Sequence, residues 1–395
     1  LLLNPLLLAS FGPVFTGWGL VVQFIFFLGM ALKCYPLMPG GLLLVEALLL
    51  GMTTPQALYE ELQHNFPVIL LLMFMVAGIY FMKDLLLFCF SRILLGVRSK
   101  ALLSLAFCFL SAFLSAFLDA LTVTAVIISA AVGFYGVYHR VASGGDPRGE
   151  AQIDTDHQLP ELAHEDLNHF RSFLRSLLMH GAVGTALGGV CTLVGEPQNL
   201  LIGHEMGWHF QDFFLKVAPV SLPVLVAGLV TCVLLEKLRW FGYGTLLPDN
   251  VRQVLAAHAA EDDAQRTAQQ RANLLVQGIA ALILIVCLGL HVAEVGLIGL
   301  LVIVLITSFT GITDEHRLGR AFQDAMPFTS LLVVFFAVVA VIHQQQLFTP
   351  LIQWVLALPA EQQPGMLFIA NGLLSAISDN VFVATIYILS LIHIS

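Results

Sequence analysis

The sequence predicts an all-α, polytopic membrane protein with inverted repeats, re-entrant hairpins and broken helices. Three observations predict this fold class. The 395-residue chain is 58% hydrophobic and only 11% charged, whereas soluble domains carry about 25% charged residues. Long apolar windows recur along the whole chain, and helix-breaking or charged residues interrupt several of them. One part of the sequence also matches a later part at a fixed offset.

Most of the apolar windows are close in length to the roughly 20 helical residues that cross a hydrocarbon core. The segment 101–138 is long enough for two crossings or for a re-entrant hairpin, and both would return the chain to the same side. The windows surround Val21 and cover residues 67–90, 101–138, 177–202, 217–235, 274–290, 297–309, 328–342 and 367–391.

When the apolar windows are counted as membrane crossings, the basic residues lie mostly in the loops on one side of the membrane. With Lys33 inside, the loop 53–66, which has no Lys or Arg, falls outside. All of the 17 Lys and Arg residues except Lys83 and Lys216 then fall in inside loops. Because cytoplasmic loops of membrane proteins carry an excess of Lys and Arg, this bias predicts the orientation of the chain.

The chain matches itself without gaps at an offset of 260 residues, ending in LSAFLD (114–119) and LSAISD (374–379). Chance similarity of two Leu-rich stretches is the alternative, but it does not explain Gly, Thr, Gln, Pro and Asp in one register. The charge count places 53–66 outside and 313–326 inside, so the two copies run in opposite directions. Inverted repeats with broken helices are the architecture of secondary transporters. Matched pairs include Gly51 with Gly311, Thr53 with Thr313, Gln63 with Gln323 and Pro67 with Pro327.

The repeat predicts three parts of the chain. Residues 1–235 form a first transmembrane half, with a re-entrant hairpin at about 101–138 and a broken helix at about 177–202. Residues 236–272 form a cytoplasmic connecting loop, and 273–395 form a second half with a hairpin tip near 378–380. The same offset would carry the second copy to about residue 495, so we expect this sequence to be C-terminally truncated.

Asp119 and Asp379 are carboxylates within apolar segments, at matched positions of the two copies. A charge inside a bilayer is costly, so such a residue predicts a functional site. Thr122 follows the first aspartate, and Ser378 and Asn380 flank the second. Hydroxyl, amide and carboxylate oxygens are the ligands of a hard cation such as sodium. The alternative is a carboxylate bonded to a helix end, and the recurrence of the pattern weighs against it.

A third candidate lies in CTLVGEPQNLL, residues 191–201. Gly195 and Pro197 predict a helix break inside an apolar span, with Glu196 and Asn199 at the break. Unpaired backbone within a bilayer is tolerated only where it lines a cavity or is buried in protein. The alternative is a proline kink closed by neighbouring helices. Upstream, the small residues of GTALGG (184–189) favour close helix contact.

Several long motifs together resemble the NhaB family of bacterial sodium/proton antiporters, which belongs to the ion transporter superfamily. The resemblance implies two inverted halves, each with a re-entrant hairpin and a broken helix, and a transport part that slides against a scaffold. It also implies, through the superfamily, a homodimer. The motifs are LMFMVAGIYFMKDLLLF, SAFLDALTVTAV, VGFYGVYHRVAS, VGTALGGVCTLVGEPQNL, EKLRWFGYG, HVAEVGLIGL and ISDNVFVATIYI.

These residues and the resemblance predict secondary active exchange of Na⁺ for H⁺ across the bacterial inner membrane by alternating access. Asp119 and Asp379 are the expected ion-exchanging carboxylates, with Glu196 as a third group at the same centre. The expected partners are Na⁺, with Li⁺ as a second cation, H⁺ and the lipid bilayer, and no cofactor is expected. The neutral ligands would be Thr122, Asn199, Ser378 and Asn380.

Two other functions remain open from the sequence. A sodium-coupled symporter of an anion such as a dicarboxylate would need cationic or neutral donors where this chain has carboxylates. An intramembrane aspartyl protease would use two aspartates as a dyad, but the chain lacks a GxGD motif. Nucleic-acid binding is not expected, because no basic patch with stacking aromatic residues occurs.

Overall fold

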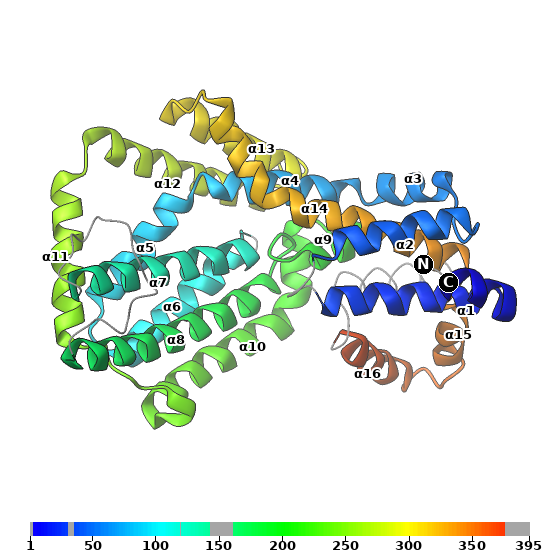
Figure 1. The fold of residues 1–395 in the computed structure, drawn as a ribbon, viewed down its shortest axis with the longest axis horizontal. Coiled ribbons are helices and arrows are strands. Elements are labelled where there is room, and N and C mark those ends of the chain that lie inside the picture. Colours follow the sequence, from blue (N-terminus) through cyan, green and yellow to red (C-terminus); the bar gives the residue numbers. More distant parts are fainter. Residues whose placement is uncertain (1–2, 31–34, 119, 143–160, 376–395) are drawn as a thin grey trace.

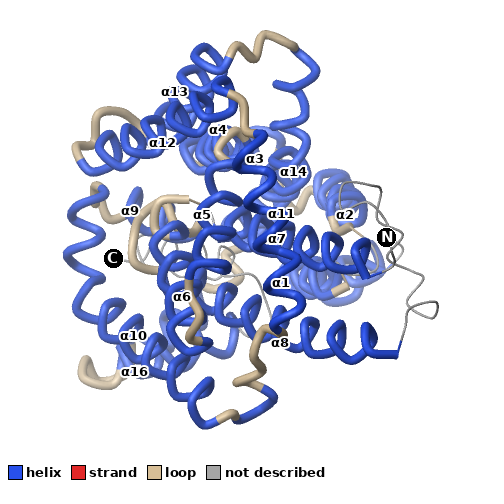
Figure 2. The backbone as a smooth tube through the Cα atoms, turned by 90° about the vertical axis from the view of Figure 1, so that its left-hand side faces the viewer, coloured by secondary structure: helices blue, strands red, loops and turns tan. Residues whose placement is uncertain are grey.

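The computed structural model describes residues 3–30, 35–118, 120–142 and 161–375, and this part of the chain is helical, with short connections and no strand. Figure 1 shows the arrangement of the helices, and Figure 2 gives the same backbone from a perpendicular direction. In chain order the helices are α1 (Leu3–Gly29), α2 (Leu37–Leu49), α3 (Pro55–His64), α4 (Phe66–Tyr80), α5 (Lys83–Gly96), α6 (Lys100–Ser115), α7 (Ala120–Ala142), α8 (Glu161–Gly189), α9 (Pro197–Glu205), α10 (Phe210–Leu238), the 3₁₀ turn η2 (Trp240–Gly242), α11 (Asp249–Gln265), α12 (Ala268–Gly289), α13 (Val295–Thr310), α14 (Glu315–Gln344), α15 (Thr349–Leu356) and α16 (Gln363–Ser375).

The helices form two groups that meet near the middle of the molecule (Figure 1). In one group α6 packs against α8 and α10, while α7 packs against α8 and α11. In the other group α14 packs against α2, α3 and α4, and α1 packs against α2. The short helix α9 contacts α4. This contact joins the two groups of helices.

Among the described residues, five helices are long and apolar enough to cross a bilayer, as the composition predicts. A sixth candidate is the pair α3 and α4, which is bent by 58°. Only 11% of the most apolar window of α10 is buried within the protein, so most of this helix presents apolar side chains outward. A polytopic protein in lipid needs such a surface. The five segments are Leu3–Gly29, Thr122–Ala142, Phe210–Leu238, Ala268–Gly289 and Ala325–Gln344.

Helix boundaries recur at the offset of 260 residues that the sequence repeat predicts. α2 is followed by Gly51 at φ 68°, and α13 is followed by Gly311 at φ 71°, a left-handed conformation that glycine adopts without strain. Thr54 caps α3 and Asp314 caps α14, each accepting a backbone N–H bond with its side chain. Other matched boundaries are the ends of α1 and α12 (Gly29, Gly289) and of α5 and α15 (Gly96, Leu356).

The copies differ at their matched prolines. Pro67 lies at the start of α4, just after the 58° bend, whereas Pro327 lies inside the continuous helix α14. At the bend, Asn65 is buried and its side-chain amide donates to the carbonyl oxygen of Glu61 at 2.9 Å. The bend between α3 and α4 in the first copy thus coincides with a side-chain hydrogen bond of the buried Asn65.

The apolar window 67–90, predicted as one crossing, is divided into two helices. α4 ends at Tyr80 and α5 begins at Lys83. The buried side chain of Gln277, from α12, accepts a hydrogen bond from the Leu85 amide at 2.8 Å. One of the free N–H groups at the start of α5 is thus paired by a residue distant in sequence. Lys83 and Asp84 interrupt the apolar window at this point, but nothing in the window itself indicated Gln277 as a partner.

The stretch 236–272, predicted as a connecting loop, contains the 17-residue helix α11. Val251 and Leu255 lie four residues apart and are 0% and 2% exposed. Residues at this spacing share one face of a helix, and α11 packs that face towards α5, α7 and α8. Residues 249–265 of the predicted connecting segment are therefore helical.

Candidate functional site

Two interruptions of helical backbone lie together in the group that contains α6, α7 and α8. The first break separates the end of α6 at Ser115 from the start of α7 at Ala120. The second break, residues 190–196, separates α8 from α9. They fall within the predicted hairpin and the predicted broken helix. Helix ends leave backbone groups without intrahelical partners, so two adjoining breaks concentrate polar backbone in one place.

The second break follows directly from its sequence. Glu196 is extended, with φ −145° and ψ 144°, which is the conformation that a following proline favours. Pro197 occupies the first turn of α9, where its missing N–H costs no helical hydrogen bond. At the other end, the Cys191 amide bonds the Gly188 carbonyl oxygen at 3.0 Å and closes the last turn of α8.

A hydrogen bond joins the two breaks. The Thr192 hydroxyl, in the second break, donates to the carbonyl oxygen of Ala116 in the first. Gly195 lies against the same backbone, since a Cβ placed there would be 2.7 Å from the carbonyl oxygen of Ser115. A larger residue at position 195 would therefore push the two breaks apart.

Asn199 holds the second break in shape. Its side-chain amide donates to the carbonyl oxygens of Gly189 at 3.0 Å and Thr192 at 2.8 Å. Because both partners are acceptors, the amide nitrogen must face them. Asn199 was predicted as a neutral cation ligand, and in this structure its nitrogen serves the backbone of the break. Because Asn199 is buried, its amide, rather than water, provides the hydrogen bonds to these two carbonyl oxygens.

Close contact between α6 and α8 fixes both breaks. A Cβ at Gly184 or Gly188 would overlap the carbonyl oxygens of Cys108 and Ala112 on α6. The two glycines are four residues apart, so they form one face of α8 on which the α6 backbone rests directly. The spacing is that of the small-xxx-small contacts of membrane helices, as the GTALGG motif predicted.

Oxygen atoms of several side chains lie at the two breaks. Gln198 donates from its amide to the Glu196 carboxylate, and both side chains are half-buried. The hydroxyl of Ser115, which is 0% exposed, has no hydrogen-bond partner within the described part of the chain. Thr122 is half-buried in the first turn of α7. The breaks thus combine one carboxylate with neutral oxygen donors.

The predicted site residues divide into two sets. Gly195, Glu196, Pro197 and Asn199 occupy the second break or the start of α9, and Thr122 lies in the first turn of the helix after the first break. The remaining predictions lie outside the described residues: Asp119, Ser378, Asp379 and Asn380. By sequence, Asp119 stands between Leu118 and Ala120, at the end of the first break.

Sequence reasoning missed Ser115 and Thr192 as members of the site. Ser115 did carry a signal, because it belongs to the repeated LSA and is matched by Ser375. Thr192 carried none, since one threonine among apolar residues is common. Its role depends on which carbonyl group the packing of α6 against α8 brings near it.

A separate buried polar cluster ties α6, α8 and α10 together. Glu236 accepts hydrogen bonds from Ser104 at 2.8 Å and from the Gly244 amide at 2.8 Å, and its carboxylate lies 3.0 Å from His180. Lys100 is 3.5 Å from the same carboxylate. The Glu236 and Lys100 side chains are 1% and 5% exposed. Since these charged groups are paired, we interpret the cluster as structural.

Comparisons with known proteins match one family over nearly the whole chain. The family described as bacterial Na⁺/H⁺ antiporter B (NhaB) matches residues 1–392. The chain is 86% identical over 388 residues to the Na(+)/H(+) antiporter NhaB of Pseudomonas entomophila, and 85% and 76% identical over the same length to those of Pseudomonas fluorescens and Pseudomonas aeruginosa. Each alignment covers 98% of this chain and 78% of the relative. The chain therefore belongs to the NhaB family of bacterial Na⁺/H⁺ antiporters.

Proposed function

We propose that this bacterial integral membrane protein exchanges Na⁺ for H⁺ at the two joined breaks. The observation that carries the proposal is the Thr192 to Ala116 hydrogen bond, which holds a break containing Glu196 against a break that ends, in sequence, at Asp119. The family match supports the exchange of these two cations. It gives no support to the dicarboxylate symporter or to the aspartyl protease.

Competition for the same oxygens accounts for exchange. A carboxyl group removed from water favours its neutral, protonated form unless a cation takes the place of the proton. Na⁺ and H⁺ would then exclude one another at the site. If the loaded forms cross and the empty, charged form does not, the proton gradient drives Na⁺ outward. The only bound species this requires are the transported ions, so the proposal includes no cofactor.

We assign the exchanging carboxylates to Asp119 and Asp379, with Glu196 as a third group at the same centre. Gly195 and Pro197 create the break that exposes polar backbone near Glu196. Ser115 joins the neutral ligands predicted from the sequence, because its buried hydroxyl is without a partner among the described residues. The complete neutral set is Ser115, Thr122, Asn199, Ser378 and Asn380.

The wider proposal follows the resemblance and the repeat. The halves 1–235 and 273–395 would alternate access by relative movement in the inner membrane, and the protein would act as a homodimer. The matched helix boundaries support the two halves. Li⁺ is the second cation we expect the site to accept, since it is also a small, hard cation.

Reconstituted vesicles with an imposed pH gradient test the proposal. Asp119→Asn should abolish Na⁺-dependent dissipation of the gradient, because an amide cannot exchange a proton for a cation. Asp249→Asn, at an exposed residue that begins α11, is the matched control and should exchange as the wild type does. Normal exchange by Asp119→Asn would reject the assignment of Asp119. Stimulation of Na⁺ uptake by an added dicarboxylate would instead restore the symporter.

A further inference from the structure

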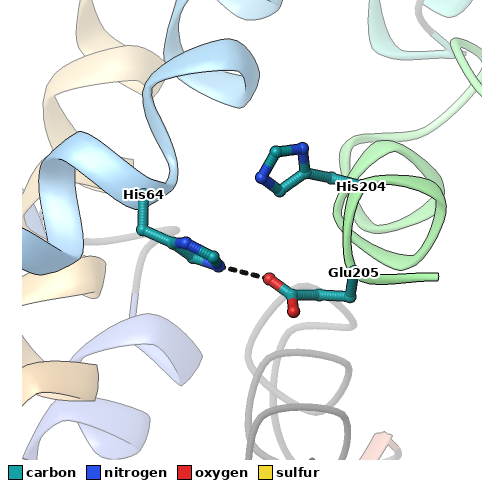
Figure 3. Close-up of side chains that lie close together, drawn as sticks. All are labelled: His64, His204 and Glu205. Carbon is teal, nitrogen blue, oxygen red and sulfur yellow. Dashed lines mark hydrogen bonds and ion pairs between the residues drawn. The ribbon is translucent and has the colours of Figure 1, made fainter. Parts of the chain in front are cut away.

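Two histidines and a glutamate meet where α9 contacts the α3–α4 bend, away from the two breaks. His64 is the last residue of α3, and His204 and Glu205 are the last two residues of α9. One ligand atom of each side chain lies within 4.8 Å of the others. Figure 3 shows the His64 and His204 rings and the Glu205 carboxylate converging on one space between the helices. Among the described residues, this is the one such group of three.

The local backbone holds these side chains in position. The Trp208 amide bonds the Gly203 carbonyl oxygen at 2.8 Å, and the Gly207 amide bonds that of His204 at 3.2 Å. Gly207 has φ 61°, a conformation that suits glycine, so the chain turns sharply just after Glu205. The His64 and Glu205 side chains are bonded to each other. The group is therefore assembled before any ion binds.

The chemistry of the donor set selects the class of ion. Two imidazole nitrogens and one carboxylate oxygen are ligands of Zn²⁺ and of related divalent transition metals, whereas Mg²⁺ and Ca²⁺ prefer oxygen ligands alone. His64 is 44% exposed in its side chain, and His204 is also exposed, so water can complete the coordination. A buried Glu205 side chain, 7% exposed, provides a negative charge that is only partly solvated.

The three-residue group is connected to the proposed transport site through helix α9. Helix α9 has nine residues and begins at the second break, so about 14 Å of helix separates the break from His204 and Glu205. α9 also packs directly on the break, because a Cβ at Gly203 would overlap the Leu193 side chain. His64 belongs to the other group of helices. An ion held by all three residues would tie α9 to the α3–α4 bend.

We propose that His64, His204 and Glu205 bind one divalent transition-metal ion, such as Zn²⁺, and that the bound ion slows exchange by fixing α9 against the α3–α4 bend. The binding step stands apart from the ion-exchange site and from the family's function. The effect on exchange rests on the proposed function. Binding and exchange are therefore measured separately.

Zn²⁺ binding to the purified full chain is measured by calorimetry and by competition with a chromophoric chelator. The wild type should bind one Zn²⁺ per chain, and His64→Ala, His204→Ala and Glu205→Gln should each bind at least about tenfold more weakly. His64→Cys should keep the site, because a thiolate is also a zinc ligand. His291→Ala is the matched control, since His291 pairs with His209, with ring centroids 4.2 Å apart, outside the group of three.

The outcomes separate the two parts of the proposal. Absence of binding by the wild type, or equal binding by His64→Ala and the wild type, would overturn the site, leaving only a histidine to glutamate contact. In vesicles, micromolar Zn²⁺ should slow Na⁺/H⁺ exchange by the wild type and by His64→Cys but not by His64→Ala. Unchanged exchange in wild-type vesicles that bind Zn²⁺ would overturn the regulatory effect alone. Failure of exchange in the absence of Zn²⁺ would instead count against the proposed function.

Discussion

Thr192 donates a hydrogen bond to the carbonyl oxygen of Ala116, a residue 76 positions earlier in the chain. This one contact connects the break after α6 to the break after α8. Glu196 lies in the second break, so its position relative to the first break depends on this contact.

Thr192→Val should lower the free energy of unfolding by about 0.5–1.5 kcal/mol, because the valine has the same shape and loses the hydrogen bond. It should also slow exchange in vesicles, since the two breaks are no longer tied. Thr192→Ser keeps the hydroxyl and should retain both properties. The control is Thr231→Val, on the exposed side of α10, where the hydroxyl bonds its own helix at Ala227. Equal thermal unfolding of the two valine variants would contradict this role.

Gly188→Ala should destabilise the protein by about 1–3 kcal/mol or prevent folding, because the new methyl group overlaps the Ala112 carbonyl oxygen. Gly278→Ala is the matched control in α12, where a Cβ would meet no atom within 4 Å. Alanine is the better helix former, so this control should be neutral or up to about 1 kcal/mol more stable. Thermal unfolding in detergent compares the two, and equal midpoints would show that α6 and α8 are not in close contact.

Glu236→Gln should cost about 3–5 kcal/mol of stability, because it leaves the charge of Lys100 buried without its partner. Replacing both residues with apolar ones, Lys100→Met with Glu236→Leu, should recover much of that loss. The exposed pair of Arg92 and Asp263 supplies the comparison, and Asp263→Asn should change stability by about 0–1 kcal/mol. A double variant no more stable than Glu236→Gln would show that the cluster contributes more than charge pairing.

Burial raises the pKa of the Tyr243 phenol above its ordinary value of 10.0, and the negative charge of Glu236 adds to this rise. The folded protein therefore keeps this proton at a pH where the unfolded chain has begun to lose it. The resulting stabilisation is complete below pH 10.0 and is lost as the pH rises through the raised pKa. Above that pH, Tyr243→Phe should gain stability relative to the wild type. Thermal unfolding measured from about pH 8 to 11 checks this, and parallel curves would contradict it.

Much of the helical architecture was predictable, because the features that specify it are local. Low charge and long apolar windows reflect a chain whose backbone must pair internally in lipid. The interruption before Pro197 follows from the ring of proline and from the conformation it imposes on Glu196. The repeat register paired Gly51 with Gly311, and the structure places both just after matched helices, each with a left-handed backbone.

Other features could not be predicted, because they depend on partners distant in the sequence. The division of the window 67–90 involves Gln277, which reaches the start of α5 from 192 residues away. Glu236 is paired only because α6, α8 and α10 pack together around it.

By itself, the sequence determined that this is an all-α membrane protein with a repeated unit, a helix break at Gly195 to Pro197 and acidic residues in apolar segments. Only the tertiary structure decided which carbonyl group Thr192 meets, which oxygens Asn199 bridges, and that His64 lies beside Glu205 across 141 residues. The physical reason is the separation along the chain over which each kind of interaction acts. Hydropathy and backbone preference act within a few residues, whereas a hydrogen bond forms with whichever group helix packing brings within about 3 Å.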